Sequence, residues 1–132
     1  MSRTGKNLDR ELFFTALADR TRLRILNLIG KDELCVCFFV EILDELQPKV
    51  SRHLAYLRKA GLVSARRDGK WMHYRVATLS DPQAAQVLRN TMEWLAEDRE
   101  MQRDRERLVK VCCAPQPPVQ LQGVPRPMSL ST

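Results

Sequence analysis

Residues 47–63, QPKVSRHLAYLRKAGLV, predict a helix with two chemically different faces. Val50, Leu54 and Leu57 recur at spacings of i, i+4 and i+7, so they form one apolar stripe that is expected to pack on neighbouring helices. Pro48 suits the first turn of this helix, and Gly61 is placed to end it. The other face, together with Ser51, is expected to enter a DNA major groove through Lys49, Arg52, His53 and Tyr56.

Two β-prone runs follow this helix, and the dipeptide Asp68-Gly69 separates them. An Asp-Gly pair between such runs is a strong local signal for a β-hairpin. The hairpin would form a wing beside the groove, with its basic side chains against the DNA backbone. These side chains are Arg66, Arg67 and Lys70.

The positive charge of the chain is concentrated in this region. Eight basic residues and one acidic residue lie in the segment 49–76, whereas the whole chain carries a formal charge of +6. Such a localised basic block favours a polyanion-binding surface, although a solvated basic face would look the same on charge alone.

Length and hydropathy exclude several classes of protein. The chain has 132 residues, which suits one domain, and 44% of them are hydrophobic. It contains no apolar run near the ~20 residues that a membrane-spanning helix needs. The N-terminal segment lacks the apolar core of a secretory signal. We therefore expect a cytoplasmic protein with no membrane partner.

The remaining segments predict further helices. Apolar spacing indicates two helices within residues 8–30, with a break at residues 19–21, and a short helix over residues 33–46. A last helix is expected over residues 82–108. Its distal half, residues 96–107, has nine charged residues among twelve and is expected to face solvent.

This order of elements predicts a mainly α fold with a β-hairpin wing, that is, a winged helix-turn-helix. Residues 1–110 would form the DNA-binding and dimerisation domain. Residues 111–132 are rich in Pro, Gln and Ser, and we expect them to form a disordered tail that carries Cys112-Cys113.

Three strings resemble the ArsR/SmtB family of metal-sensing repressors, and in particular its arsenic-responsive branch: ELCVC at residues 33–37, the helix at 47–63, and RRDGKWMHYRV at 66–76. TRLRIL at residues 21–26 is also similar to the second helix of that family, and the resemblance covers roughly residues 8–100. It implies a homodimeric repressor that uses its first and last helices, here 8–18 and 82–108, as the dimer surface. Such a repressor would bind a palindromic double-stranded operator until trivalent arsenic or antimony releases it.

The resemblance assigns the metalloid site to Cys35 and Cys37, with a third thiolate from Cys112 or Cys113, of the same or the other subunit. In the family pattern a third Cys often stands where this chain has Val40. Residues i and i+2 of a regular helix point about 200° apart, so we expect the start of this helix to unwind when both thiols bind one ion. The distortion would then move the helix that reads DNA.

Other readings of the cysteines remain open. Cys35 and Cys37 could be small buried core residues, or either cysteine pair could be a redox switch in a repressor with a thiol-redox or non-metal signal. A small thiol enzyme is disfavoured because the chain has no Cys-x-x-Cys motif and no phosphate-binding loop. The only histidines, His53 and His73, lie outside residues 82–110, so we expect no zinc site on the last helix.

Overall fold

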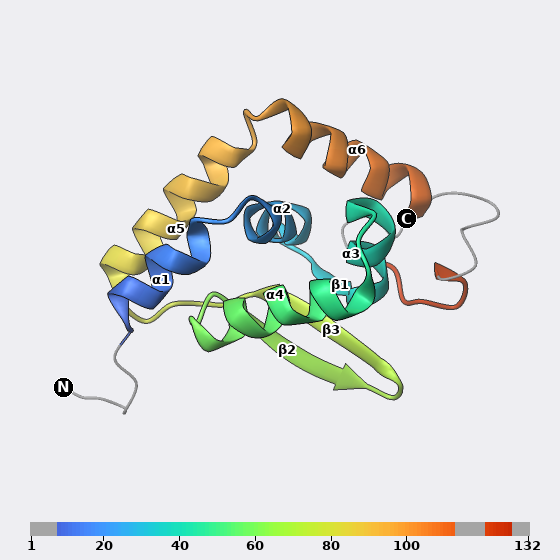
Figure 1. Ribbon diagram of the computed structural model, residues 1–132, viewed down its shortest axis with the longest axis horizontal. Coiled ribbons are helices and arrows are strands. Elements are labelled where there is room, and N and C mark those ends of the chain that lie inside the picture. Colours follow the sequence, from blue (N-terminus) through green and yellow to red (C-terminus); the bar gives the residue numbers. More distant parts are fainter. Residues whose placement is uncertain (1–7, 113–120, 128–132) are drawn as a thin grey trace.

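The computed structural model describes residues 8–112 and 121–127. Figure 1 shows the fold, in which the helices gather on one side of a small antiparallel sheet and a hairpin projects at the edge of the molecule. The elements, in chain order, are α1 (Arg10–Leu17), α2 (Arg20–Ile29), β1 (Glu33–Cys35), α3 (Val36–Leu43), α4 (Gln47–Lys59), β2 (Val63–Asp68), β3 (Trp71–Val76), α5 (Pro82–Leu95) and α6 (Arg99–Cys112).

Aspartate caps define the first two helices. The Asp9 carboxylate accepts a hydrogen bond from the main-chain N–H of Leu12 at 3.0 Å, and Asp19 accepts one from Arg22 at 3.0 Å. Each carboxylate satisfies an N–H that the helix itself leaves without a partner. The predicted break at residues 19–21 is confirmed, because α1 ends at Leu17 and Asp19 caps α2.

The segment 33–46 differs from its prediction as one helix. Its first three residues form strand β1, which pairs antiparallel with β3, and α3 begins only at Val36. The helix ends at Leu43, and its C-cap residue Asp44 adopts a left-handed conformation with φ 55°. The pairing partner of β1 lies about forty residues further along the chain, so local periodicity could not reveal the strand.

The predicted hairpin is confirmed. Strands β2 and β3 pair antiparallel with Asp68 opposite Trp71, and β3 lies between β2 and β1 in the sheet. Gly69 adopts φ 62°, a conformation that glycine reaches without strain, and this permits the tight turn at the wing tip.

The predicted single helix over residues 82–108 is wrong, because the chain bends after Leu95. The carboxylate of Asp98 accepts from the main-chain N–H groups of Glu100 and Met101 at 2.9 and 3.2 Å, and so starts a new helix. Figure 1 shows the result: α5 lies beside α1, whereas α6 turns back across α2 and reaches α3.

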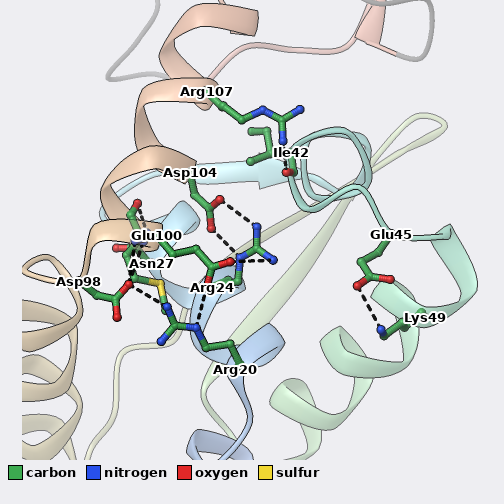
Figure 2. A network of polar contacts seen from close by, with 11 residues as sticks. Arg20, Arg24, Asn27, Ile42, Glu45, Lys49, Asp98, Glu100, Asp104 and Arg107 are labelled. Atoms are coloured by element: carbon green, nitrogen blue, oxygen red, sulfur yellow. Dashed lines mark hydrogen bonds and ion pairs between the residues drawn. The ribbon is translucent and has the colours of Figure 1, made fainter.

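The distal half of the predicted helix is also not simply solvent-facing. Helix α6 buries a stripe of residues at spacings of three or four: Met101, Asp104, Leu108 and Cys112. Its charged residues bind neighbouring elements, as Figure 2 shows for Arg24 with Asp104 and for Arg20 with Asp98 and Glu100. Arg107 donates to the main-chain oxygen of Ile42 at 2.6 Å, at the C-terminal end of α3.

The core lies between the helices and the inner face of the sheet, and its largest side chains include Phe13, Phe39, Leu34 and Ile25. In the short segment 121–127, Leu121 and Val124 are buried in this core. The boundary predicted between residues 110 and 111 stays a prediction, although α6 continues to Cys112. In the part of the chain that is described, no helix is long and apolar enough to cross a bilayer.

Candidate functional site

Helix α4 presents the two faces that its sequence predicts. Val50, Leu54 and Leu57 are fully buried against the core. Ser51 and Arg52 are exposed on the opposite side. Lys49 is half-buried, and its ammonium lies 3.1 Å from the carboxylate of Glu45 in the preceding turn. The helix therefore has a free polar surface near its N-terminal end, which is the end that reads base edges in helix-turn-helix proteins.

His53 and Tyr56 are less exposed than the rest of this face, because Arg22 of α2 covers them. The Arg22 guanidinium Nη1 lies 3.3 Å from His53 Nδ1, and its central carbon lies 4.4 Å from the centre of the Tyr56 ring. Burial lowers the pKa of His53, and nearby cations lower it further, although Asp19 acts in the opposite direction. Sequence reasoning missed Arg22, because no local pattern links it to residues more than thirty positions away.

The wing presents its basic residues to solvent. Arg66, Arg67 and Lys70 are all exposed. Arg66 donates two hydrogen bonds to the Glu33 carboxylate, at 2.6 and 3.1 Å, and these bonds lower the pKa of Glu33. The ammonium of Lys70 lies 4.9 Å from the centre of the Trp71 ring. Helix α4 packs against β2, so the exposed basic residues of α4 and of the wing lie on neighbouring elements.

Cys35 and Cys37 lie at the junction between β1 and α3. Cys35 is the last residue of β1 and the N-cap of α3, with extended φ and ψ of −72° and 149°. Because Cys35 lies outside the helix, the two thiols can be hydrogen-bonded neighbours. The expectation that the helix must unwind before both thiols can bind one ion is therefore wrong: α3 already starts after Cys35.

The surroundings of the two thiols are apolar. Cys35 is buried, and Cys37 is half-buried. Burial raises the pKa of Cys37 to about 11, with further contributions from the charge of Cys35 and from a hydrogen bond to it. Cys37 is thus a protonated thiol at neutral pH. A pair of neighbouring thiols in an apolar setting fits a soft ion that binds sulfur.

The third predicted thiolate is not placed with this pair. Cys112 is buried at the end of α6, and Cys113 lies outside the described residues. Within residues 8–112 and 121–127, no three Cys, His, Asp or Glu side chains gather closely enough to hold a metal ion. Cys35 and Cys37 are thus two neighbouring thiols, and both their role as ligands and the source of a third thiolate remain predictions.

A helix-turn-helix with a hairpin wing and a basic outer side defines a winged-helix DNA-binding regulator of transcription. The sequence pattern described as "Bacterial regulatory protein, arsR family" matches residues 19–65. The arsenical resistance operon repressor of Escherichia coli is 41% identical over 102 residues, which cover 76% of this chain and 86% of the relative. The chain belongs to the ArsR family of bacterial regulatory proteins, as its sequence motifs indicate. This is a family of transcriptional regulators and not of enzymes.

Two further comparisons agree with this assignment. The arsenic resistance transcriptional regulator ArsR1 of Pseudomonas putida is 44% identical over 92 residues, which cover 66% of this chain and 72% of that protein. Among solved structures, HlyU from Vibrio cholerae superposes with a TM-score of 0.56 at 27% identity, over 67% of this chain and 88% of HlyU. The expected winged-helix fold is therefore confirmed.

Proposed function

We propose that this chain is an arsenic-responsive transcriptional repressor. It binds operator DNA of an arsenic or antimony resistance operon and leaves that DNA when trivalent arsenic or antimony binds Cys35 and Cys37. The observation that carries the proposal is the position of these two neighbouring thiols at the β1–α3 junction, between the wing sheet and the helix before α4. The printed names of the similar proteins, which refer to arsenic resistance, support the choice of ligand.

The chemistry of the thiol pair suits arsenite in its neutral trihydroxy form. Two thiols replace two hydroxyl groups on arsenic, two As–S bonds form, and two water molecules leave. A third thiol, from Cys112 or Cys113 of either subunit, replaces the last hydroxyl in the same way. Each thiol proton leaves in a water molecule, so the high pKa of Cys37 does not oppose arsenite binding. A divalent cation must instead displace the proton, and a high pKa opposes its binding.

Ligand binding would act on DNA through two elements that touch the thiol pair. Strand β1 pairs with β3 of the wing, where Cys35 lies opposite His73. Helix α3 packs against α4, which carries the proposed reading face. A ligand releases DNA only to the extent that it binds the DNA-free arrangement of these elements more tightly than the DNA-bound one.

The DNA contacts follow from exposure and charge. Lys49, Ser51 and Arg52 would face the major groove, with His53 and Tyr56 at the inner edge of the same surface. The wing residues Arg66, Arg67 and Lys70 would contact the flanking backbone.

The active form would be a homodimer built on α1 and α5. These two helices lie side by side and expose large apolar side chains, with Phe14 55%, Val87 36% and Trp94 75% exposed. A surface of this kind is typical of a protein–protein contact. A two-fold dimer would place two α4 helices on the two halves of a palindromic operator. The proposed surface uses α5 and not the whole segment 82–108, because α6 turns away from α5.

A thiol-redox repressor is the second candidate, because the two thiols are neighbours. Hydrogen peroxide would oxidise them to a disulfide, with both thiol protons and two electrons passing to the peroxide to give two water molecules. Thiolates react with peroxide, however, and the raised pKa of Cys37 keeps it in the unreactive thiol form. This observation favours metalloid binding.

Fluorescence anisotropy tests the proposal. Reduced protein is bound to labelled DNA from its own promoter and titrated with arsenite, antimonite or peroxide. We expect arsenite or antimonite to release the wild type but not Cys35→Ser, which should still fold because serine is a favoured N-cap residue. Cys112→Ser is the control for a thiol on another element.

Each other outcome contradicts part of the proposal. If arsenite releases the Cys35→Ser protein from DNA but leaves the Cys112→Ser protein bound, the inducer site would lie at the end of α6. Release of the wild type by peroxide alone would favour the redox repressor. A wild type that stays bound under all three conditions would remove a thiol-directed signal altogether.

A further inference from the structure

One guanidinium group joins α1 to α4. Arg22 Nε donates to the main-chain oxygen of Ala16 at 2.9 Å, and Nη2 donates to that of Thr15 at 3.0 Å. The third nitrogen, Nη1, lies 3.3 Å from His53 Nδ1, while the flat face of the group covers the Tyr56 ring at 4.4 Å. The Arg22 side chain therefore donates to the C-terminal end of α1 through Nε and Nη2. It contacts α4 through Nη1 and through the flat face of the guanidinium.

These contacts satisfy groups that need partners. The last carbonyl groups of a helix lack partners within the helix, and α1 has no basic residue of its own in its last turn. Arg22 supplies donors from α2, one to the Ala16 carbonyl and one to the Thr15 carbonyl, which also accepts from the main-chain N–H of Ala18 at 3.1 Å. Asp19 completes the joint, because its carboxylate accepts from the Arg22 main-chain N–H at 3.0 Å and lies 3.8 Å from His53 Nδ1.

The joint connects two surfaces with different proposed roles. Helix α1 belongs to the proposed dimer surface, and α4 carries the proposed reading face. In a two-fold dimer, the spacing and tilt of the two reading helices depend on how each α4 is held relative to its own α1. Base-edge hydrogen bonds require this register, whereas phosphate contacts tolerate small changes in it.

We propose that Arg22 is a positioning residue for operator recognition, because it fixes α4 relative to α1 and so sets the preference of the dimer for operator over unrelated DNA. The inference rests on the proposed function, since it requires that α4 reads DNA in a dimer. In this proposal, His53 and Tyr56 are the residues of α4 that contact Arg22 at the inner edge of the reading face.

Arg22→Gln tests the proposal, and Arg20→Gln is its matched control. Both variants remove one positive charge from the same helix, but Arg20 pairs with Asp98 and Glu100 and so links α2 to α6 rather than to α4. The measurement is the affinity of each folded protein for operator and for an unrelated duplex of the same length, at several salt concentrations. Circular dichroism and thermal melting establish that each variant is folded.

We expect Arg22→Gln to reduce the ratio of operator to unrelated affinity about tenfold, as befits the loss of hydrogen bonds from a charged donor. Its affinity for unrelated DNA and its salt slope should match the wild type, because Arg22 contacts no phosphate in this proposal. Arg20→Gln should keep the wild-type ratio. Arg22→Lys should lose part of the ratio, because one ammonium cannot donate to two carbonyls and His53 while also covering a ring.

A pH series on the wild type supplies a second readout that needs no variant. His53 accepts from Arg22 in the neutral tautomer that carries its proton on Nε2, whereas protonated His53 has no free lone pair on Nδ1 and cannot accept. The charged groups that face His53 are Asp19 and Arg22 from α2 and its cap, with Lys49 and Arg52 from α4. Since burial holds the pKa of His53 below its usual value, the affinity ratio should stay constant at neutral pH and fall only at more acidic pH.

Three results would overturn the inference. A folded Arg22→Gln protein with the wild-type ratio would show that the joint does not position α4 for reading. An equal loss in Arg20→Gln would assign the effect to general destabilisation. A wild-type ratio that is constant over the whole acidic range in which the protein stays folded would remove the role of neutral His53. A wild type that prefers no operator at any pH would instead overturn the proposed function, and this inference with it.

Discussion

Asp104 is a carboxylate buried on the inner side of α6, where it is 3% exposed. It binds Arg24 of α2 through two parallel hydrogen bonds of 2.8 and 2.9 Å, as Figure 2 shows. The bond to Asp104 raises the pKa of Arg24, which is already always charged. A buried pair of this kind adds modest stability when intact, but removal of one partner leaves a charge without compensation.

We therefore expect Asp104→Asn to lower the free energy of unfolding by about 3 kcal/mol. Glu100→Gln is the matched control on the same helix, because Glu100 pairs with Arg20 at 2.7 Å and more loosely with Arg24 at 3.7 Å but is 41% exposed. Its effect should stay near ~0.5 kcal/mol, as for surface pairs. Urea denaturation measures both values, and equal effects of the two variants would contradict the special weight given to the buried pair.

The high pKa of the Cys37 thiol follows from its burial and from its neighbour Cys35. Ultraviolet absorbance of the thiolate, measured by difference against Cys37→Ser, should show Cys37 ionising with a pKa of about 11. In Cys35→Ser the pKa of Cys37 should fall, because two of the three causes that raise it come from Cys35. It should remain above the usual value for a thiol, because Cys37 is still partly buried. Ionisation of the wild-type thiol at its usual value of about 8.5 would contradict the observed pairing of the thiols.

The elements differ in how far the sequence predicts them. The boundaries of α4 and the hairpin depend on local signals, namely Pro48, Gly61 and Asp68-Gly69, and both elements were predicted. Strand β1 exists because a distant strand pairs with it, so its own three residues carry no adequate signal.

The break between α5 and α6 was missed for a related reason. Charged residues at helical spacing predict an exposed helix, and the partners that bury α6 lie on α2 and α3. The thiol pair was found from its motif, but its geometry depends on β1 and was mispredicted along with that strand. Arg22 escaped notice because its partners are set by packing and not by spacing.

The salt dependence of DNA binding tests whether the charged residues of the wing contact DNA. Arg67 is exposed and, among the residues that the structure describes, donates a 3.4 Å hydrogen bond to the main-chain oxygen of Gly69. Arg67→Gln should flatten the slope of log affinity against log salt by about one unit and weaken operator and unrelated DNA equally. An unchanged slope would remove the wing tip from the interface.

At the scale of the whole molecule, the proposed dimer predicts a difference between two exposed apolar residues. Trp94 lies on α5 and Val109 on α6, and they are 75% and 44% exposed. Trp94→Asp should dissociate the dimer and weaken operator binding at least tenfold, because a new charge at the centre of an apolar contact is costly. Val109→Asp should leave the dimer intact, because α6 turns away from that surface.

Sedimentation equilibrium measures the dimer in each variant. The secondary structure of Trp94→Asp should match the wild type, because the residue contributes little to the core of its own subunit. A monomeric wild type would contradict the dimer itself, and dissociation by Val109→Asp rather than Trp94→Asp would place the contact on α6.

The pairing of β1 with the wing has a consequence for how the protein can vary over evolutionary time. Main-chain pairing of β1 with β3 connects the strand that ends at Cys35 to the wing, and the two hydrogen bonds from Arg66 to Glu33 add a side-chain link. Side chains along these strands can therefore change without breaking the main-chain pairing, as long as none is replaced by proline, which would remove a hydrogen-bond donor from the sheet. In the proposed repressor, side chains that set the preference for operator and ligand could therefore change while the main-chain pairing between the thiol site and the wing is kept.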